Sequence, residues 1–196
     1  MSEILFIRHA ETDMVGTFCG QSDPELNMRG RGQLAELVSK LRTEDIGAVY
    51  ASDLRRAHTT GIAVAEAFGV DCHVRSALRE IGFGDWEGLT WEEIERRDEA
   101  YARRWVAEYP SLPAPNGETF RDFERRVLEE VKLLSMEVET GGSIAVVTHA
   151  GVIRVVLCAL DDCSEKDVWE RTRAHCCIVR HTGAASPSLR RVEVRS

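Results

Sequence analysis

The sequence lacks an excess of positive charge. Its 25 lysines and arginines are outnumbered by 33 aspartates and glutamates, which gives a net charge of −8 at pH 7. Proteins that bind nucleic acid or anionic membranes without specificity depend on the opposite balance. We therefore expect no nucleic-acid partner and no membrane partner, while a local basic pocket stays compatible with this charge.

A long hydrophobic run is missing from the start of the chain. The first apolar run covers only residues 4–7, and no basic residue precedes it. A secretion signal needs about 7–15 apolar residues after a basic segment, and a membrane-spanning helix needs about 20. The expected location is therefore cytoplasmic.

The six cysteines lack the Cys-x2-Cys spacing of common metal sites, and without a secretion signal they do not indicate a disulfide framework. A zinc site built from the C-terminal cysteines and His175 is the sharper alternative. However, Cys158 falls in an apolar helix pattern and Cys176-Cys177 opens an apolar strand-like run. We favour buried, reduced cysteines, and we expect no metal and no cofactor. The cysteines are Cys19, Cys72, Cys158, Cys163, Cys176 and Cys177.

The 196 residues suffice for one substantial hydrophobic core, so a single domain over residues 1–196 is expected. Apolar runs typical of buried strands alternate with segments of helical periodicity. This alternation favours an α/β fold, a three-layer sandwich with a mainly parallel central sheet flanked by helices and with a terminal antiparallel hairpin or edge strand. The expected strands are residues 4–7, 46–51, 72–74, 143–148, 176–179 and 189–194, and the expected helices lie near 34–41, 57–68, 91–108, 119–134 and 153–160.

Three side chains stand where a helix cap is expected. Asn27, Ser52 and Thr119 each precede a helical pattern and carry an oxygen that can accept a hydrogen bond from a free backbone N–H. Thr119 and Asp122 are spaced like a capping box. Residues 30–35 also match the Gly-x-Gly-x-x-Ala spacing of dinucleotide-binding loops, but no strand precedes them, so we interpret this match as coincidence.

Two segments between the expected elements are candidates for substrate contact. Residues 10–27 form a polar, glycine-containing stretch that is too long for a simple connection. Residues 84–116 combine a charged amphipathic helix with a proline-rich break at Pro110 to Pro115. We expect this second segment to be a lid-like insertion over the mouth of the active site.

Three apolar strands end in chemically capable residues. The first ends in Arg8-His9, the second leads into Arg55-Arg56, and a later one ends in His149. Parallel strands bring such residues to one carboxyl edge, where open α/β sheets bind their ligands. Arginine forks match phosphate oxygens, and the helix that starts at Ala150 adds N–H groups and a positive dipole end. The sequence therefore predicts phosphoryl chemistry at this edge of the sheet.

A lone histidine at a strand end is more often a satisfied polar residue than a catalyst. The shared position of His9 and His149, each after a four-residue apolar run, argues for catalysis. The other histidines have no such context, and we interpret them as surface or structural residues. They are His58, His73, His175 and His181.

Arg8-His9-Ala10-Glu11-Thr12 resembles the Arg-His-Gly-Glu-Thr signature of a known family, the phosphoglycerate-mutase-like branch of the histidine phosphatase superfamily. Four further blocks resembling those of the family follow in the expected order across most of the chain. The second block aligns Arg56, not Arg55, with the phosphate-binding arginine. The four blocks are Ser52 to Thr60, Leu78-Arg79-Glu80 with Gly84 to Gly88, Pro115 to Thr119, and Val147 to Gly151.

The resemblance implies a mechanism. His9 would attack phosphorus and become a phosphohistidine, while Arg8, Arg56 and His149 neutralise the phosphate oxygens. Glu80 would protonate the leaving alkoxide and then deprotonate the incoming water. Glu11 and Glu87 are rival carboxylates, whose alternative reading is local hydrogen bonding in a loop and a turn. No metal is required, because the arginines take the part of magnesium.

Two departures from the family pattern concern substrate binding. Asp13 to Gly16 stand where the family usually has an asparagine, so one phosphate contact is either missing or supplied by Thr17. Gly20 lies where the family often brings backbone N–H groups to the substrate, and with Ala150 it completes the expected substrate-binding set of Arg8, Arg56 and His149.

The resemblance also favours one function over the alternatives. The compact chain is more similar to the phosphatase members, in particular α-ribazole-phosphate phosphatases, than to the mutases with their longer insertion. A phosphomonoester hydrolase acting on a small phosphorylated metabolite, with α-ribazole phosphate as one candidate, is the leading hypothesis. The alternatives are a 2,3-bisphosphoglycerate-dependent phosphoglycerate mutase and a non-catalytic domain that binds a phospho-ligand. The oligomeric state is open, with a homodimer as one alternative.

Overall fold

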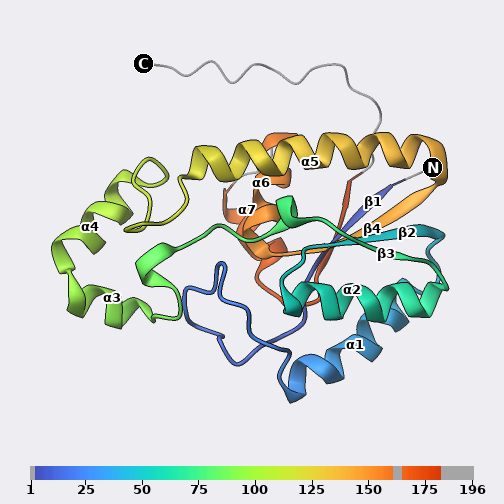
Figure 1. The fold of residues 1–196 in the computed structure, drawn as a ribbon, viewed down its shortest axis with the longest axis horizontal. Coiled ribbons are helices and arrows are strands. Elements are labelled where there is room, and N and C mark those ends of the chain that lie inside the picture. Colours follow the sequence, from blue (N-terminus) through green and yellow to red (C-terminus); the bar gives the residue numbers. More distant parts are fainter. Residues whose placement is uncertain (1–2, 161–164, 182–196) are drawn as a thin grey trace.

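The computed structural model describes residues 3–160 and 165–181. Five strands form one sheet in the order β3-β2-β4-β1-β5. Every neighbouring pair is parallel except β1 with β5, which is antiparallel, so the predicted α/β class and mainly parallel sheet are confirmed (Figure 1). The strands are β1 Ile4–Arg8, β2 Ile46–Ala51, β3 Cys72–Val74, β4 Ser143–Thr148 and β5 Ile178–His181.

Helices cover both faces of this sheet. Helices α1 and α2 pack on one face, and α5, α6 and α7 on the other, whereas α3 and α4 extend beyond the sheet (Figure 1). None of the described helices combines the length and apolarity needed to cross a membrane. The helices are α1 Met28–Leu41, α2 Arg55–Phe68, α3 Trp91–Arg97, α4 Glu99–Glu108, α5 Phe120–Gly141, α6 Ala150–Leu160 and α7 Glu165–Thr172, with short 3-10 turns at Ser76–Leu78 and Gly84–Trp86.

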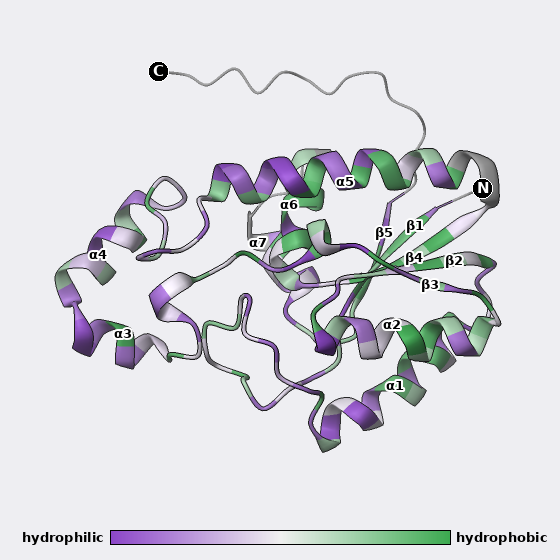
Figure 2. Cartoon of the chain, in the orientation of Figure 1, coloured by the Kyte–Doolittle hydropathy of each residue, from purple (hydrophilic) through white to green (hydrophobic). Residues whose placement is uncertain are grey.

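The continuous apolar runs of β1 and β4 follow from their position between two helical layers. In β1, Ile4 and Phe6 point into the core under α5 and α6, while Leu5 and Ile7 point into the core over α1 and α2. Successive strand residues face opposite sides, so a strand covered on both sides must be apolar throughout. Figure 2 shows β1 as hydrophobic along its length, whereas α1 and α5 carry both hydrophilic and hydrophobic residues.

The C-terminal edge strand is confirmed in part. β5 pairs antiparallel with β1 along Ile4–Ile7 and forms the edge of the sheet. The second strand of the predicted hairpin, residues 189–194, lies outside the described residues. Helix α7 was not predicted, because its short sequence has no clear apolar periodicity.

The single helix predicted over residues 91–108 is wrong, because the segment forms two helices. Asp98 ends α3 and caps α4, with its side-chain oxygen accepting a hydrogen bond from the Tyr101 N–H at 3.0 Å. A short carboxylate that can cap a new helix competes with continuing the old one. The two helices pack around a separate aromatic cluster. Its buried members are Trp86, Ile94, Ala102 and Ala114, with Phe18, Phe83, Leu89, Trp91, Tyr101 and Trp105 packed against them.

Two of the three predicted helix caps are confirmed. Asn27 Oδ1 accepts from the Gly30 N–H at 2.7 Å, and Thr119 Oγ1 accepts from the Asp122 N–H at 3.1 Å. The cap predicted at Ser52 is wrong, since α2 begins only at Arg55 and its N-cap residue, Leu54, has no side-chain cap. Residues 30–35 lie inside α1, as expected for a coincidental match to the dinucleotide spacing.

Candidate active site

Strand pairing brings His9 and His149 together. β1 and β4 run parallel with Arg8 opposite Thr148, so the residue after each strand lies at the same edge of the sheet. The His9 N–H donates to the Thr148 carbonyl at 2.9 Å, and the two imidazole centroids are 5.1 Å apart. The predicted convergence of these two strand ends is therefore present.

The surroundings of His9 fix the ring as a neutral base with one free nitrogen. His9 Nδ1 lies 2.7 Å from the carbonyl oxygen of Ala10, which can only accept, so Nδ1 carries the proton. Burial, followed by the charge of Arg56, holds the pKa of His9 well below its ordinary value of 6.5. The unprotonated Nε2 is therefore available as a nucleophile.

His149 is fully buried and held by Ser52, the residue that does not cap α2. Ser52 Oγ accepts from the Leu54 N–H at 3.3 Å and lies 3.0 Å from His149 Nε2, and we assign the Ser52 hydroxyl as the donor to that nitrogen. Burial, with Arg56 as the next cause, lowers the pKa of His149 well below 6.5, so the ring is neutral with its proton on Nδ1. The Nδ1–H group is therefore a hydrogen-bond donor whose direction is fixed by the orientation of the imidazole ring.

The two arginines are anchored by backbone carbonyls rather than by carboxylates. Arg56, with no exposed surface, donates to the carbonyls of Ser22 at 2.6 Å and Gly20 at 2.7 Å. Arg8 donates to the carbonyls of Thr172 at 3.0 Å and Arg173 at 2.6 Å. Carbonyls orient a guanidinium without cancelling its charge, so both arginines keep a full positive charge for a ligand.

Three buried donor nitrogens at this site have no hydrogen-bond partner among the described residues. They are Arg8 Nε, Arg56 Nε and His149 Nδ1. An unpaired buried donor costs about 1–3 kcal/mol, so three of them on residues that neighbour His9 indicate a place for an acceptor. A phosphate group carries several acceptor oxygens and the negative charge that the arginines need.

Glu80 sits at the N-terminal end of α6. Its Oε2 accepts from the Gly151 N–H and its Oε1 from the Ile81 N–H, each at 3.0 Å. A side chain at position 151 would collide with this carboxylate, so only glycine allows the approach. Arg126 donates to the Glu80 carbonyl at 3.0 Å and fixes the backbone behind it.

Glu11 and Glu87, the two other candidates for the acid, form local hydrogen bonds, as the alternative interpretation of these residues expects. Glu87 accepts from the N–H groups of Gly20, Gln21, Ser22 and Phe83 and from the Ser22 hydroxyl, at 2.7–3.1 Å. Burial raises the pKa of Glu87, but these hydrogen bonds outweigh it, and the net shift is downward. Glu11 accepts from Asn27 Nδ2 at 3.2 Å and pairs with Arg29 at 3.3 Å.

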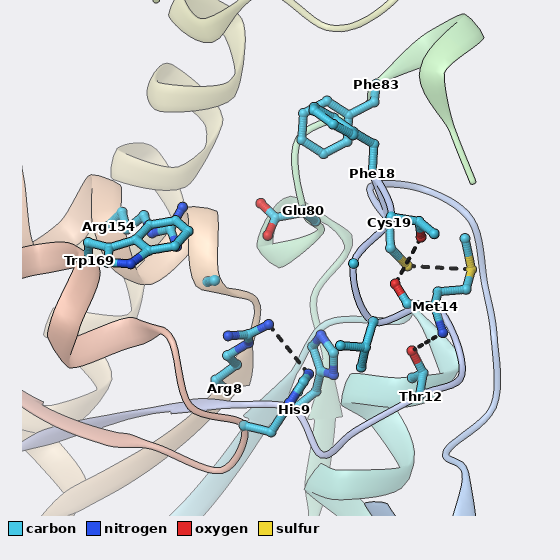
Figure 3. Close-up of a pocket in the computed structure, with 15 residues that line it drawn as sticks. Arg8, His9, Thr12, Met14, Phe18, Cys19, Glu80, Phe83, Arg154 and Trp169 are labelled. Carbon is cyan, nitrogen blue, oxygen red and sulfur yellow. Dashed lines mark hydrogen bonds between the residues drawn. The ribbon is translucent and has the colours of Figure 1, made fainter. Parts of the chain in front are cut away.

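A cavity of about 340 Å³ opens above His9 (Figure 3). Four predicted site residues line it, while Arg56 and His149 are buried behind this surface. The Gly20 N–H is donated to Glu87 and the Thr17 hydroxyl to the Met14 carbonyl, so neither is a free donor for substrate. The lining residues are Arg8, His9, Thr12, Met14, Val15, Gly16, Thr17, Phe18, Cys19, Glu80, Phe83, Ala150, Arg154, Trp169 and His175.

The interpretation of His175 as a surface or structural residue is corrected, because His175 lines the cavity. The antiparallel pairing of β5 with β1 continues at the strand end, where the Cys176 N–H donates to the Arg8 carbonyl at 3.1 Å. His175 Nε2 consequently lies 3.4 Å from Arg8 Nη2, and its ring centroid lies 5.6 Å from that of His9. The usable signal was its place just ahead of an apolar strand.

Arg154 is a second cavity residue that sequence reasoning missed. It lies four positions after Ala150 on α6, and residues at this spacing share one face of a helix. Once Ala150 is placed at the site, the spacing alone would place Arg154 beside it. No group of three or more His, Cys, Asp or Glu side chains among the described residues is arranged to hold a metal ion.

A neutral histidine, two arginines and a carboxylate are gathered at the carboxyl edge of a parallel sheet, an arrangement suited to phosphoryl transfer. Residues 4–191 match the pattern of the histidine phosphatase superfamily (branch 1), and the chain belongs to this family. It is a phosphatase of the histidine type, as the relatives named below are.

Three similar proteins illustrate the match. Phosphoserine phosphatase 1 of Hydrogenobacter thermophilus is 32% identical over 165 residues, which cover 82% of this chain and 76% of that protein. Glucosyl-3-phosphoglycerate phosphatase of Mycobacterium tuberculosis is 33% identical over 166 residues, covering 80% and 74%. The crystal structure of the α-ribazole phosphatase from Shigella flexneri superposes with a TM-score of 0.81 at 27% identity, covering 91% and 89%. The chain spans 43% of the length of some mycobacterial relatives.

Proposed function

We propose that this protein hydrolyses small phosphomonoesters through a phosphohistidine on His9, without a metal ion. The observation that carries the proposal is the pairing of a free, neutral His9 Nε2 with three unpartnered donors around it, on Arg8, Arg56 and His149. A dianionic phosphate would satisfy all three donors and would lie within reach of the nucleophile. Each of these residues was expected at this site from the sequence.

The first step transfers the phosphoryl group to the enzyme. His9 Nε2 forms a bond to phosphorus while the bond from phosphorus to the alcohol oxygen breaks, and that oxygen takes a proton from the Glu80 carboxyl group. The charge that builds on the equatorial oxygens is stabilised by Arg8, Arg56 and the His149 Nδ1–H. The products are the free alcohol, a phosphohistidine and the Glu80 carboxylate.

The second step returns the enzyme to its starting state. The Glu80 carboxylate takes a proton from water as the water oxygen forms a bond to phosphorus, and the bond between phosphorus and Nε2 breaks. Inorganic phosphate leaves, and Nε2 regains its lone pair. The position of Glu80 supports its proposed role in both steps, because it lines the same cavity as His9 and backbone N–H groups hold its two carboxylate oxygens.

Hydrolysis of p-nitrophenyl phosphate by His9→Ala tests the proposal. We expect phosphate release to fall by at least about 10³-fold, since the nucleophile is lost. His73→Ala is the matched control, because His73 is an exposed histidine on β3 away from the cavity, and its rate should match that of the wild type. Unchanged rates in His9→Ala would reject the mechanism.

Two further measurements separate the alternatives. Acid-labile, base-stable phosphate trapped on the wild-type chain but not on His9→Ala supports the intermediate. Interconversion of 3- and 2-phosphoglycerate without net phosphate release would instead identify a mutase, and tight retention of phosphate without turnover would identify a binding domain. A panel with α-ribazole phosphate, phosphoserine, sugar phosphates and 3-phosphoglycerate would identify the alcohol.

A further inference from the structure

We propose that Arg154 forms a carboxylate-binding subsite in the cavity, so that the preferred substrates are phosphomonoesters whose alcohol part carries a carboxylate. This inference rests on the proposed phosphatase function and names a substrate class for it. The phosphate-binding donors lie on Arg8, Arg56 and His149, and Arg154 is a cation of the cavity that they leave unused.

Arg154 is held in one orientation. Its Nε donates to Thr172 Oγ1 at 3.0 Å, while the Thr172 hydroxyl donates to the Val168 carbonyl at 2.8 Å. Its guanidinium lies 4.3 Å from the centroid of the Trp169 ring. Stacking on one face and the hydrogen bond donated by Nε restrain the Arg154 guanidinium. A planar guanidinium held in this way is suited to bind a carboxylate through two parallel hydrogen bonds.

The position of Arg154 matches the place where the alcohol must lie. The leaving oxygen has to reach Glu80, and Glu80 is bonded to the Gly151 N–H in the first turn of α6. Arg154 follows Gly151 by three positions, so it stands on the same face of the helix, one turn further on. A substrate that presents its bridging oxygen to Glu80 therefore extends its carbon skeleton past Arg154.

The charges in the cavity leave Arg154 without a counter-charge during the first step. In the part of the chain that the structure describes, no Asp or Glu forms an ion pair with Arg154, and Glu80 is the one acidic side chain that lines the cavity. The three histidines of the site are neutral, and a phosphate dianion balances Arg8 and Arg56. When Glu80 is protonated to act as the acid, the charge of Arg154 is uncompensated. A single carboxylate on the substrate restores the balance.

The opposite wall limits the size and polarity of the alcohol. Phe18 and Phe83 pack edge to face with centroids 5.0 Å apart, and Figure 3 shows them across the cavity from Arg154 and Trp169, with Glu80 between the two walls. The volume of about 340 Å³ is at the small end of ligand sites. These walls favour a compact phosphorylated hydroxy acid with an aliphatic edge.

Two matched substrate pairs test the subsite. 2-Phosphoglycolate and ethyl phosphate share the phosphate and a two-carbon chain but differ in the carboxylate, and O-phosphoserine and O-phosphoethanolamine differ in the same way. We expect the wild type to prefer the carboxylated member of each pair in kcat/KM by at least about tenfold, mainly through KM. In Arg154→Met this preference ratio should fall to near one, and Arg154→Lys should recover part of it, since it restores the charge but not the fork.

Arg125→Met is the matched control, because Arg125 is an exposed arginine on α5 that pairs with Asp122 on the same helix. Its preference ratio should equal that of the wild type. The proposal is overturned if the wild type shows no preference within either pair, or if Arg154→Met lowers kcat/KM equally for both members. Absence of phosphate release from every ester, p-nitrophenyl phosphate included, would overturn the proposed function instead.

Discussion

Three histidines that cannot easily accept a proton lie together at the proposed site, namely the proposed nucleophile His9 and its neighbours His149 and His175. Burial is the first cause in each case, and it lowers the pKa of His175 to about 4 and the pKa values of His9 and His149 well below 6.5. The nearby arginines act in the same direction. A neutral nucleophile at ordinary pH is the functional consequence, and a pH-dependent stability is the thermodynamic one.

We expect the free energy of unfolding to fall as the pH is lowered from 6.5. The unfolded chain protonates these histidines near pH 6.5, whereas the folded chain does not, so acid favours unfolding. Each such histidine contributes a slope of up to about 1.4 kcal/mol per pH unit in the window below 6.5, and the effect is absent above it. Urea unfolding between pH 7.5 and 5.5 measures this slope.

His149→Gln should lose one histidine's share of that slope, and His9→Gln provides a second measurement at an independent position. His73→Gln should keep the wild-type slope, because His73 is exposed on β3 and lies outside this group of buried histidines. Equal slopes in the wild type and in both buried-site variants would contradict the assignment of neutral histidines.

At the scale of elements, Glu87 connects the turn that follows Glu80 to the loop that follows β1. Its carboxylate accepts four backbone N–H groups and one hydroxyl, from Gly20 to Ser22 and from Phe83. The same loop supplies the carbonyls that anchor Arg56. The Glu87 carboxylate thereby sets the position of Arg56, the arginine proposed to bind phosphate.

Glu87→Gln should destabilise the protein by about 1–3 kcal/mol, because one of its two oxygens becomes an NH₂ group that faces donors. It should also raise KM for p-nitrophenyl phosphate, since the carbonyls that hold Arg56 lose their support. Urea unfolding and steady-state kinetics check both effects. Glu92→Gln, the same change at an exposed position of α3, should have neither effect. Equal behaviour of the two variants would contradict the proposed role of Glu87 in holding this loop.

Elements defined by local pattern could be predicted from the sequence, and those defined by tertiary partners could not. The apolar runs of β1 and β4 and the periodicity of α2 and α5 carry their own signal. The break at Asp98 depends on a capping bond, and the role of Ser52 depends on His149, 97 residues away. His175 reaches the site only because β5 pairs with β1.

At the scale of the whole molecule, the described residues bury their apolar side chains in three clusters. Two lie on opposite faces of the sheet, and the third is the aromatic cluster around α3 and α4. Phe18 and Phe83 belong to the edge of this third cluster and also line the cavity. If residues 84–116 act as the predicted lid, the third cluster has to open without disturbing the sheet. A small core that is separate from the main one can open locally at a lower free energy than global unfolding.

Ile94→Ala tests this separation, because Ile94 is 1% exposed at the centre of the third cluster. The lost methyl groups and the cavity left behind should cost about 2–5 kcal/mol within that cluster. Amide hydrogen exchange should then accelerate in α3 and α4 and stay slow in β1 and β4. Val106→Ala, which truncates an exposed apolar side chain on α4, should leave the exchange pattern unchanged. Equal acceleration in β1 and β4 would show that the clusters unfold as one unit, and a lid that moves independently would then be excluded.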